Sequence, residues 1–458
     1  MNNIPVKKNE EYIVDIIDNG FEGEGIAKID NFTVFIKGTI KGEKCKILII
    51  KVTTSYCIGK ILEIINKSEN RVEPDCDTYR RCGGCNLRHI KYEKTLQMKS
   101  YNVQNLVNKE LKTKIEVQPA IGMDTPYYYR NKAQFPFGKD KNAEPILGIF
   151  AERTHEIIPF NNCYIQNTTS QLIAQTVLDF IKKHRISIYD EKTGKGLFRH
   201  LVIKIGVRTN EIMCVFVLNN EKFNEEYELI NLLKDKFPNI KTIVKNINSK
   251  NTNVIMGDKN IVLFGDGYIN DILNGYKFKI SPLSFYQTNP SQTEILYNTA
   301  IKAANLSKDD VVLDLYCGIG TIGICASSFV KQVYGIEIIE QAIEDAKENA
   351  RINNIDNIKF RCGAVENILE DLIKEEKITP NIVFVDPPRR GLDKNTVDNI
   401  LKLKPEKVIY ISCNPATMIR DLKKLEEFYN IEQIQPVDMF PFTSHVEVCA
   451  LLELKNCQ

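Results

Sequence analysis

The sequence predicts a three-part chain: a small N-terminal β-barrel, a central α+β region and a C-terminal α/β domain with a doubly wound sheet. Three observations support this prediction. The chain has 458 residues, enough for two to four domains at roughly 100–200 residues each. Residues 7–65 show short alternating strand patterns between Gly and Asp-Asn turns. From about residue 280, strand and helix patterns alternate regularly, as in parallel α/β domains.

The first two parts are distinguished by their periodicity. Residues 1–66 carry the alternating pattern of the barrel, whereas residues 67–270 mix strand patterns with helical ones. Strand runs such as LVIKIGV and IMCVFVL accompany the helical run SQLIAQTVLDFIKK. Apolar residues recur at helical spacing over 92–112, which predicts a helix there.

The third part, residues 271–458, contains the elements of an α/β domain in order. Each strand pattern is a short run rich in Val, Ile and Tyr, and helical patterns lie between the strands. The expected elements are VVLDLY followed by a helix, VYGIEI, the helix QAIEDAKENARI, IKFRCG, NIVFVDPP, KVIYIS and the last strand EVCALLEL.

Composition excludes some classes of protein. Hydrophobic residues make up 43% and charged residues 26% of the chain, and no apolar run approaches the ~18 residues of a membrane span. With the polar start MNNIPVKKNE, this predicts a cytoplasmic protein without a membrane partner. Thirteen cysteines are too sparse for a disulfide scaffold. The net charge of +2 gives no global indication of a nucleic-acid partner, so such a partner has to be argued from local sites.

A glycine motif follows the first strand of the α/β domain. In DLYCGIGTIG, Gly318, Gly320 and Gly323 match G-x-G-x-x-G, and Glu337 ends the next strand about 20 residues later, where an acid takes ribose hydroxyls. A nicotinamide cofactor would satisfy this much. Asp314 before the loop, the C-terminal place of the domain and the segment VDPPRRGL favour S-adenosylmethionine instead. The domain resembles a class I S-adenosylmethionine-dependent methyltransferase.

The segment after the fourth strand bears on the methyl acceptor. Asp386, Pro387 and Pro388 resemble the loop beside the methyl donor in such enzymes. Enzymes that methylate exocyclic amines usually continue with an aromatic residue that stacks on the base. Arg389 stands there in this chain, which weakens the prediction of an amine acceptor.

Cys413 follows the fifth strand and is a candidate nucleophile. Uracil C5 is a poor nucleophile, and addition of a thiolate to C6 makes C5 reactive. NPATMIRDLKKL predicts a helix with Asn414 as N-cap and Pro415 at its first position, so the helix dipole would favour the thiolate. Without this context, a buried strand-end cysteine would be the simpler interpretation.

Glu447 is a candidate base. After methyl transfer C5 still holds a proton, which a base must remove. A carboxylate between Val446 and Val448 in an apolar strand is costly unless it is partnered or its pKa is raised, and a raised pKa suits a base. The alternative is that strand alternation points Glu447 to solvent. His445 would lie on the same face as Glu447 by alternation.

Together, several motifs resemble those of the RNA (uracil-5-)-methyltransferase family across the last ~180 residues: SFYQTNP, DLYCGIGTIG, GIE, DPPRRGL, ISCNPAT and FPFTSHVE. The resemblance implies that Cys413 is the nucleophile and Glu447 the base. It also implies that four further residues bind S-adenosylmethionine, namely Gln287, Tyr316, Glu337 and Asp386. Two positions depart from the pattern, since members often have Asp where Ala364 stands and some have Asn where Thr321 stands.

Four cysteines remain in the central part: Cys76, Cys82, Cys85 and Cys163. Their spacing leaves zinc and an iron–sulfur cluster open, because both can be held by four thiolates. CDTYRRCGGC is similar to the segment that binds a [4Fe-4S] cluster in the ribosomal-RNA members of the family. The resemblance therefore implies a [4Fe-4S] cluster, with zinc as the alternative.

The resemblance also implies the partners and the roles of the other parts. The N-terminal barrel resembles a TRAM domain, an OB-like RNA-binding module, and the helix over 92–112 is expected to pack on the catalytic domain. The expected product is 5-methyluridine in RNA, in 23S ribosomal RNA first and in transfer RNA as the alternative, made by a monomer. Arg residues beside the cysteines and the segment YYYRNKAQF combine cations and aromatic rings as readers of single-stranded RNA do.

Other classes of function stay open. A nicotinamide-dependent oxidoreductase would explain the glycines but leave Cys413 and Glu447 without a role. A non-catalytic RNA-binding protein would share the barrel. A cytosine-C5 methyltransferase is disfavoured, because the RNA enzymes of that kind place a cysteine after Asp-x-Pro, near the position of Arg389.

Overall fold

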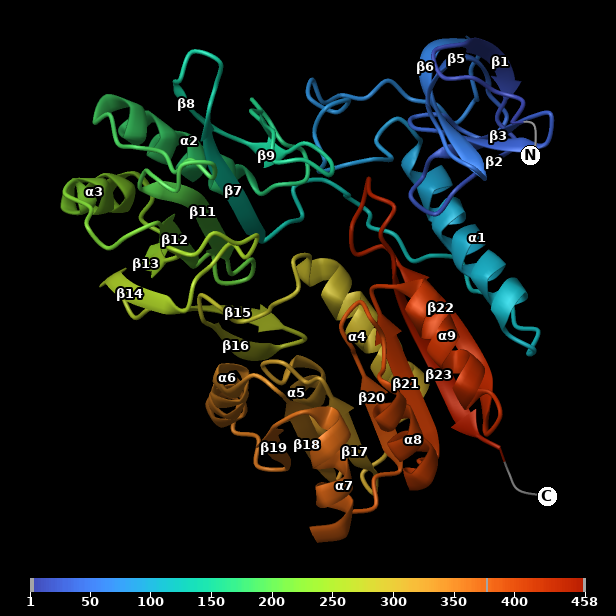
Figure 1. The fold of residues 1–458 in the computed structure, drawn as a ribbon. Coiled ribbons are helices and arrows are strands. Elements are labelled where there is room, and N and C mark those ends of the chain that lie inside the picture. Colours follow the sequence, from blue (N-terminus) through green and yellow to red (C-terminus); the bar gives the residue numbers. More distant parts are fainter. Residues whose placement is uncertain (1–3, 376–377, 456–458) are drawn as a thin grey trace.

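The structure is a computed structural model that describes residues 4–375 and 378–455. It contains the three expected parts, an N-terminal β-sheet domain, a central α+β region and a C-terminal α/β domain (Figure 1). Within the described residues, no helix is both long enough and apolar enough to cross a membrane.

The N-terminal part is a six-stranded sheet with the order β1-β5-β6-β4-β3-β2. Its core is built by alternation: along β5, Cys45, Ile47 and Ile49 are fully buried while their neighbours are partly exposed. β1 contacts β3 as well as β5, which curves the sheet toward a barrel. The strands are β1 (Glu11–Asp15), β2 (Asp18–Asn19), β3 (Gly25–Ile29), β4 (Phe32–Ile36), β5 (Lys44–Val52) and β6 (Tyr56–Asn66).

The central region has a six-stranded sheet with the order β14-β13-β12-β11-β7-β8. A two-stranded ribbon of β9 and β10 accompanies it, and two helices, α2 and α3, cover one face (Figure 1). The elements are β7 (Lys132–Lys139), β8 (Pro145–Leu147), β9 (Ile149–Phe150), β10 (Ile157–Ile158), α2 (Thr168–Lys183), β11 (Phe198–Ile205), β12 (Ile212–Leu218), α3 (Glu226–Lys236), β13 (Ile240–Ile247) and β14 (Lys259–Phe264).

Strand β12 belongs both to the core of the central region and to the core of the C-terminal domain. All seven of its residues are buried, and alternate side chains enter two different cores. Cys214 and Phe216 pack under α2 and α3, whereas Met213 and Val215 join the core of the C-terminal domain. A strand covered on both faces needs an unbroken apolar run, which is what IMCVFVL supplies. The hairpin of β15 (Ile269–Leu273) and β16 (Tyr276–Ile280) lies in the same shared core.

The C-terminal domain is a seven-stranded sheet with the order β19-β18-β17-β20-β21-β23-β22, in which only β23 is antiparallel to both of its neighbours. Helices cover both faces. The elements are α4 (Pro290–Ala304), β17 (Val311–Leu315), α5 (Thr321–Ser327), β18 (Gln332–Glu337), α6 (Glu340–Ile352), β19 (Ile358–Cys362), α7 (Val365–Glu375), β20 (Ile382–Val385), α8 (Lys394–Leu403), β21 (Lys407–Ser412), α9 (Pro415–Leu425), β22 (Tyr429–Val437) and β23 (Glu447–Leu454).

Strand β22 is the one strand of this sheet that the sequence analysis did not name. It is the edge strand beside β23, and it contains Pro436. Proline is tolerated at a sheet edge because its missing N–H breaks no ladder between two strands. The segment YNIEQIQPV alternates buried and exposed residues at its start, as a strand does, but its proline weakens the strand pattern in the sequence.

Helix α1 (Tyr92–Glu110) precedes the central region in the chain but lies against α9 and β22 of the C-terminal domain (Figure 1). Its Val103 and Val107 share one apolar core with α9. A buried ion pair adds a polar anchor, since Lys99 Nζ lies 2.5 Å from Asp438 Oδ1 and both side chains are at most 3% exposed. Tyr92 donates a hydrogen bond of 2.8 Å to the same carboxylate.

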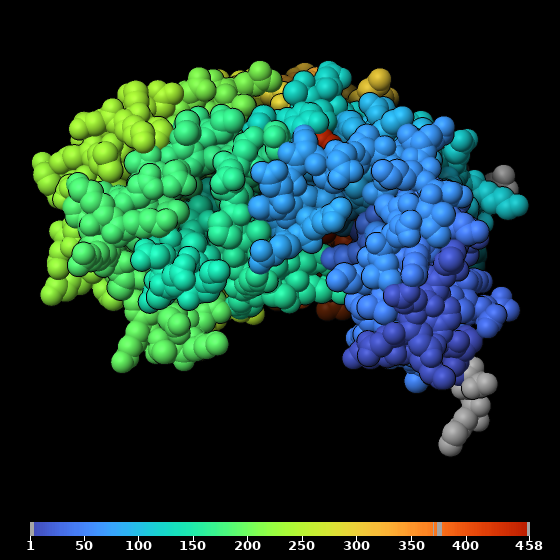
Figure 2. All heavy atoms as spheres, turned by 90° about the horizontal axis from the view of Figure 1, so that it is seen from above, coloured from blue at the N-terminus to red at the C-terminus, as the bar shows by residue number. Residues whose placement is uncertain are grey.

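The N-terminal domain and the central region flank an opening above the C-terminal domain. Seen from above, atoms of the C-terminal residues are visible between the blue and green parts (Figure 2). The N-terminal domain meets the loop between β9 and β10 through exposed ion pairs, Arg153 with Glu22 and Lys37 with Glu152. Such pairs stabilise a contact only weakly.

Candidate active site

The glycine loop between β17 and α5 has the strand-loop-helix geometry that the sequence predicts. Tyr316, Gly318 and Gly320 all have left-handed backbone conformations, with φ of +65°, +55° and +82°. Asp314 Oδ2 accepts a hydrogen bond of 2.9 Å from the backbone N–H of Gly323, which ties the strand to the helix. A Cβ atom at Gly320 would lie 2.9 Å from the ring of Phe360, so only glycine fits there.

Glu337 closes the loop from the next strand. Its carboxylate accepts hydrogen bonds from the backbone N–H groups of Gly318 (3.2 Å) and Ile339 (3.0 Å). The acid at the end of β18 therefore fixes the first glycine of the motif. This is the position expected of a residue that would meet the ribose of a bound nucleoside.

A pocket opens beside this loop. It is lined by the segment Phe285–Gln287, α4, the glycine loop and Asp386. Three of the four residues expected to hold S-adenosylmethionine line it, namely Gln287, Tyr316 and Asp386, and the fourth, Glu337, is bonded to Gly318 at its wall. A Cβ atom at Gly318 would meet no described atom within 4 Å, so the glycine leaves room beside it. These features fit a nucleoside-bearing methyl donor.

Asp386 follows β20 and begins the loop that leads to α8. Burial raises the pKa of its carboxyl group to about 7. The loop is fixed by the carbonyl oxygen of Arg389, which accepts hydrogen bonds from Asn414 Nδ2 (2.9 Å) and Thr417 Oγ1 (3.1 Å). The ends of β20 and β21 are thereby held together.

Cys413 lies where the sequence places it, between β21 and the start of α9. Asn414 is the N-cap and accepts a hydrogen bond of 3.2 Å from the backbone N–H of Ala416. The thiol is partly buried, and burial raises its pKa to about 11; the negative charges of Glu447 and Asp386 add to the rise, while Arg389 opposes it. The helix dipole is expected to favour the thiolate, whereas burial and the charges of the two carboxylates act in the opposite direction.

Glu447 is the first residue of β23 and is only 3% exposed. The alternative that strand alternation points it to solvent is wrong, because both faces of this inner strand are covered. Burial raises its pKa to about 8; the charge of Asp386 contributes, and Arg389 opposes the shift. Cys413, Asp386, Glu447 and Arg389 therefore influence one another in a single site.

His445 does not share the environment of Glu447. It lies in the turn before β23 and is exposed, so strand alternation does not yet apply to it. Partial desolvation and then positive charges lower its pKa, while Glu22 opposes the shift. The charged groups that act on it come from all parts of the chain, namely Arg389, Lys99, Arg130 and Glu22. The site thus lies at the junction of the three parts.

The turn before Glu447 is held by the cysteine-bearing segment. The carbonyl oxygen of Phe442 accepts hydrogen bonds from the backbone N–H groups of Asn86 (3.1 Å) and Leu87 (3.0 Å). The backbone N–H of Ser444 donates to Asn86 Oδ1 at 2.8 Å. The position of the candidate base therefore depends on residues next to Cys85 in the chain.

The four central cysteines, Cys76, Cys82, Cys85 and Cys163, line one small cavity. Burial raises the pKa of Cys82, of Cys163 and of Cys85, the last to about 12, and nearby thiols add to the rise. The charge of Arg130 opposes these shifts. In the described part of the chain, no three His, Cys, Asp or Glu side chains are arranged to hold a metal ion.

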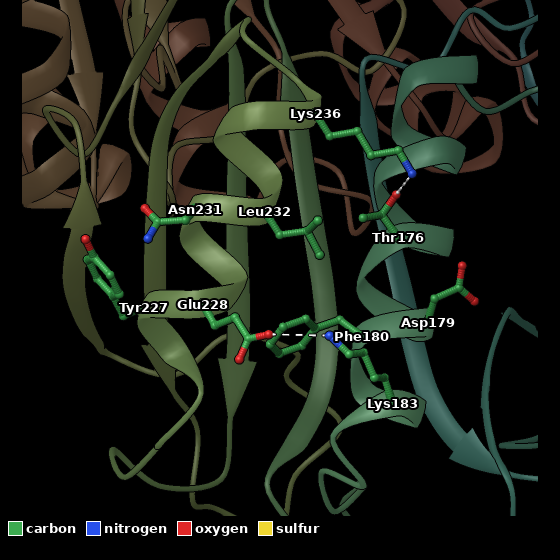
Figure 3. Close-up of a pocket in the computed structure, with 9 residues that line it drawn as sticks. All are labelled: Thr176, Asp179, Phe180, Lys183, Tyr227, Glu228, Asn231, Leu232 and Lys236. Atoms are coloured by element: carbon green, nitrogen blue, oxygen red, sulfur yellow. Dashed lines mark hydrogen bonds and ion pairs between the residues drawn. The ribbon is translucent and has the colours of Figure 1, made fainter.

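A second hollow lies on the central region, between α2 and α3 (Figure 3). It contains surface contacts such as Lys236 Nζ to Thr176 Oγ1 at 2.9 Å and Lys183 with Glu228 at 3.6 Å. These helices cover the face of the central sheet that is turned away from the C-terminal domain. The groove therefore lies apart from the candidate active site.

Comparison with known proteins decides the family. The family model described as tRNA (uracil-5-)-methyltransferase matches residues 91–455, and the TRAM domain model matches residues 5–62. The chain belongs to the tRNA (uracil-5-)-methyltransferase family. Its N-terminal sheet is a TRAM domain.

Relatives and a solved structure agree with this family. An RNA methyltransferase of Clostridium tetani is 46% identical over 450 residues, covering 98% of this chain and 97% of the relative. One of Staphylococcus aureus is 44% identical over 451 residues, covering 98% and 99%. The crystal structure of Pyrococcus abyssi tRNA (uracil-54, C5)-methyltransferase with S-adenosyl-L-homocysteine matches with a TM-score of 0.76 and 25% identity, covering 97% of this chain and 100% of that one.

Membership of this family confirms that the chain has the fold of an S-adenosylmethionine-dependent methyltransferase and that its substrate is RNA. The nicotinamide-dependent oxidoreductase and the non-catalytic RNA-binding protein are therefore set aside. Thr321, one of the two positions that depart from the motif pattern, lines the pocket beside the glycine loop, where its hydroxyl is 3.0 Å from that of Tyr297.

Several residues of the site were not singled out from the sequence. The sequence analysis uses Arg389 only to weigh the kind of methyl acceptor, although Arg389 is the cation that acts on Cys413 and Glu447. The pair of Lys99 and Asp438 joins residues more than 300 positions apart, so no local pattern could reveal it. The position of Arg389 directly after Asp-Pro-Pro was the one available indication.

Proposed function

We propose that this methyltransferase forms 5-methyluridine in RNA through a covalent bond between Cys413 and C6 of the target uracil. The observation that carries the proposal is the arrangement of Cys413, Asp386 and Glu447 next to the donor pocket. One thiol and two carboxyl groups with raised pKa values can supply both a nucleophile and proton acceptors at one carbon atom.

The first step concerns the proton of Cys413. With a pKa of about 11, the thiol is protonated at neutral pH and must lose its proton before it can add to carbon. Asp386, with a pKa of about 7, is partly ionised at neutral pH and can accept this proton. The sulfur then bonds to C6, and the electron pair of the C5–C6 double bond moves toward C5 and O4. Arg389 stabilises negative charge in this site.

The second step uses the pocket of Gln287, Tyr316, Glu337 and Asp386. When bound there, S-adenosylmethionine supplies an electrophilic methyl group. C5 takes this methyl group and the bond from the methyl carbon to the donor's sulfur breaks. The role of the protein in this step is to hold C5 in line with the bond from the methyl carbon to the donor's sulfur.

In the third step, Glu447 acts as the base. C5 then carries both the methyl group and its original proton, and Glu447 removes this proton. The double bond re-forms and Cys413 leaves as a thiolate, so the enzyme returns to its starting state after reprotonation. A pKa of about 8 makes Glu447 a stronger proton acceptor than an ordinary carboxylate.

The four-cysteine cavity would hold a [4Fe-4S] cluster, and zinc is the alternative. Two features support this part of the proposal. All four sulfur-bearing residues line the same cavity, and the arginine nearby would balance the negative charge of four thiolates. A single zinc ion needs four sulfur atoms about 2.3 Å from one point, whereas a cluster separates them more widely. The cluster would stabilise the segment that holds the turn before Glu447.

For the RNA, we propose 23S ribosomal RNA, on the resemblance of CDTYRRCGGC to the ribosomal members. Transfer RNA is the second candidate, because the family model and the Pyrococcus abyssi protein are both described as transfer-RNA enzymes. The enzyme would act as a cytoplasmic monomer.

Two experiments test these proposals. The purified enzyme, S-adenosylmethionine with a labelled methyl group, and either transcribed 23S ribosomal RNA or transfer RNA are incubated together, and the labelled nucleosides are identified by mass spectrometry. We expect 5-methyluridine in the ribosomal RNA; label in transfer RNA alone would favour the second candidate, and label in cytidine or adenosine would contradict the proposed chemistry. RNA containing 5-fluorouridine should form a covalent adduct, because the fluorine at C5 cannot leave as a proton does.

A further inference from the structure

A group of aromatic side chains lies between the four-cysteine cavity and the turn that precedes Glu447. Tyr127 is its exposed member, with 39% of its surface accessible, and Tyr128, Tyr164 and Phe442 surround it. We propose that the ring of Tyr127 stacks on an unpaired nucleobase of the substrate RNA, beside the uridine that enters the active site. This inference rests on the proposed function in that it takes RNA as the substrate of the neighbouring site.

The ring of Tyr127 is supported from within the protein. Its centroid lies 5.3 Å from that of Phe442 and 6.3 Å from that of Tyr164, both at inclined angles. The guanidinium carbon of Arg88 lies 5.2 Å from the centroid of Tyr127. A ring that is packed on one side and exposed on the other is a rigid platform, because little side-chain entropy remains to be lost on binding.

The backbone also directs Tyr127 outward. Tyr128 has a φ of +55°, an uncommon conformation for a residue with a bulky side chain. It is held there by a hydrogen bond of 2.7 Å from its N–H to the carbonyl of Tyr164, and Arg130 N–H bonds to Ile165 in the same way at 3.1 Å. Across this turn Tyr127 is exposed whereas Tyr129 is buried. Strained residues of this kind are concentrated at binding sites.

The platform adjoins the reaction site through Phe442. Phe442 belongs to the turn that ends at Glu447, and the hydroxyl of Tyr129 donates to the carbonyl oxygen of Pro441 at 3.2 Å in the same turn. Exposed His445 follows three residues later. Because the ring of Tyr127 packs on Phe442 in this turn, a nucleotide that reaches Glu447 would bring the next nucleotides of the RNA chain toward Tyr127.

Arg88 adds positive charge beneath the aromatic group. Its guanidinium carbon lies 4.7 Å from the Tyr164 centroid and 4.4 Å from the Phe442 centroid, and the group is paired with Asp75. The residue is 3% exposed, and its Nη1 atom has no hydrogen-bond partner among the described residues. Aromatic rings combined with arginine are the surfaces on which proteins stack single-stranded bases. The alternative role for Tyr127 is merely to cover Arg88.

The test compares three substitutions at Tyr127 with a control. Tyr127→Phe keeps the ring, Tyr127→Leu keeps an apolar cover over Arg88 without a ring, and Tyr127→Ala removes both. Tyr227→Ala is the matched control, because Tyr227 is a 77% exposed tyrosine on α3, at the groove on the far face of the central sheet (Figure 3). The dissociation constant for whichever RNA is methylated, and for a single-stranded oligouridylate, is measured without S-adenosylmethionine.

Loss of one base-stacking contact costs about 1–3 kcal/mol, or about 5- to 150-fold in affinity. We expect Tyr127→Ala and Tyr127→Leu to weaken RNA binding within this range, with Tyr127→Phe and Tyr227→Ala close to the wild type and S-adenosylmethionine affinity unchanged. Ultraviolet cross-linking should yield an RNA-bearing peptide that contains residue 127. Wild-type affinity in Tyr127→Leu would overturn the proposal and leave Tyr127 as a cover for Arg88, and equal losses in Tyr127→Phe would show that the hydroxyl matters instead of the ring.

The outcome is separable from that of the proposed function. RNA binding and cross-linking require no methyl transfer, so they report on Tyr127 even if uridine is not the nucleoside modified. Thermal unfolding of each variant shows whether a lost affinity comes from a lost fold. If Tyr127→Ala unfolds early, Tyr127→Leu decides the question, because its apolar side chain keeps the cover over Arg88.

Discussion

The chain places buried thiols in two settings that differ in the charges around them. Cys413 faces two carboxylates, Asp386 and Glu447, with Arg389 as the opposing cation. The thiols of the four-cysteine cavity influence one another, and the cations near them are Arg130 and, at Cys85, also Arg88. Burial raises thiol pKa values in both places, to about 11 at Cys413 and about 12 at Cys85.

The difference shows how neighbouring charges assign different roles to the same functional group. We propose that a carboxylate beside Cys413 takes the proton of the thiol, so that nucleophile and proton acceptor would be supplied together. Thiols that gather at one cavity raise one another's pKa, and the positive charge of the proposed metal cluster would allow them to ionise. The first setting suits covalent catalysis and the second suits a metal centre.

The largest effect is expected from Cys413→Ala. If Cys413 forms the covalent bond, turnover should fall by at least about 10⁴-fold, the scale seen when an enzyme loses its nucleophile. The affinity for S-adenosylmethionine, measured by calorimetry, should be nearly unchanged, because the thiol does not hold the donor. Cys362→Ala, which changes the exposed cysteine at the end of β19, serves as the control. Equal turnover in both variants would remove Cys413 from the mechanism.

Glu447→Gln should slow turnover by ~10²–10⁴-fold, the usual contribution of a positioned base. Methyl transfer precedes its step, so a methylated RNA–protein adduct should accumulate from ordinary uridine and appear on a denaturing gel. Glu453→Gln changes a partly exposed carboxylate on the same strand and should behave as the wild type. Absence of both adduct and product in a Glu447→Gln enzyme that still binds RNA and donor would show that another group is the base.

Cys85→Ser tests the second setting. Anaerobically purified wild type should contain about four iron atoms per chain and be brown, as a cubane cluster implies, and the variant should lose this iron. We expect a smaller loss of turnover, roughly tenfold, because residues 86 and 87 act on Glu447 indirectly, through their hydrogen bonds to the turn before it. One zinc ion per chain in place of iron would support the alternative metal. A metal-free, fully active wild type would show that the four-cysteine cavity is not a metal centre.

The pH dependence of turnover tests whether Glu447 and Cys413 interact. Glu447 must be ionised to act as the base, so wild-type turnover should rise as pH increases through about 8, the pKa that burial gives this group. Because the charge of Glu447 raises the pKa of Cys413, its removal should lower that pKa. Adduct formation with 5-fluorouridine RNA should therefore occur at lower pH in Glu447→Gln than in the wild type. Identical pH profiles would mean that the two groups do not interact.

The smallest effect is expected from the loss of an exposed ion pair. Arg153→Ala removes an exposed ion pair with Glu22 between the central region and the TRAM domain. Exposed pairs contribute about 0–1 kcal/mol, so the midpoint of urea unfolding should hardly move. A clear loss of stability would show that the contact between these parts is stronger than its exposed charges imply.

Much of the fold was predictable from sequence because its determinants are local. KVIYIS and EVCALLEL form strands at the expected residues, and Asn414 caps the helix that follows Cys413. N-caps, glycine turns and apolar periodicity act within a few residues, so they can be recognised without knowing the rest of the chain. The order of motifs likewise indicated a methyltransferase domain before any contact was known.

Only the tertiary structure decided which groups act on one another. Sequence alternation left open whether Glu447 is buried, and it misplaced His445, because the strand starts after that residue. The thiol of Cys413 has a raised pKa although it precedes a helix, since desolvation and the charges of Asp386 and Glu447 sum over residues distant in the chain. α1 reaches the C-terminal domain across more than 300 residues through Lys99 and Asp438. Burial and electrostatic interaction depend on distance in space, which local sequence patterns do not determine.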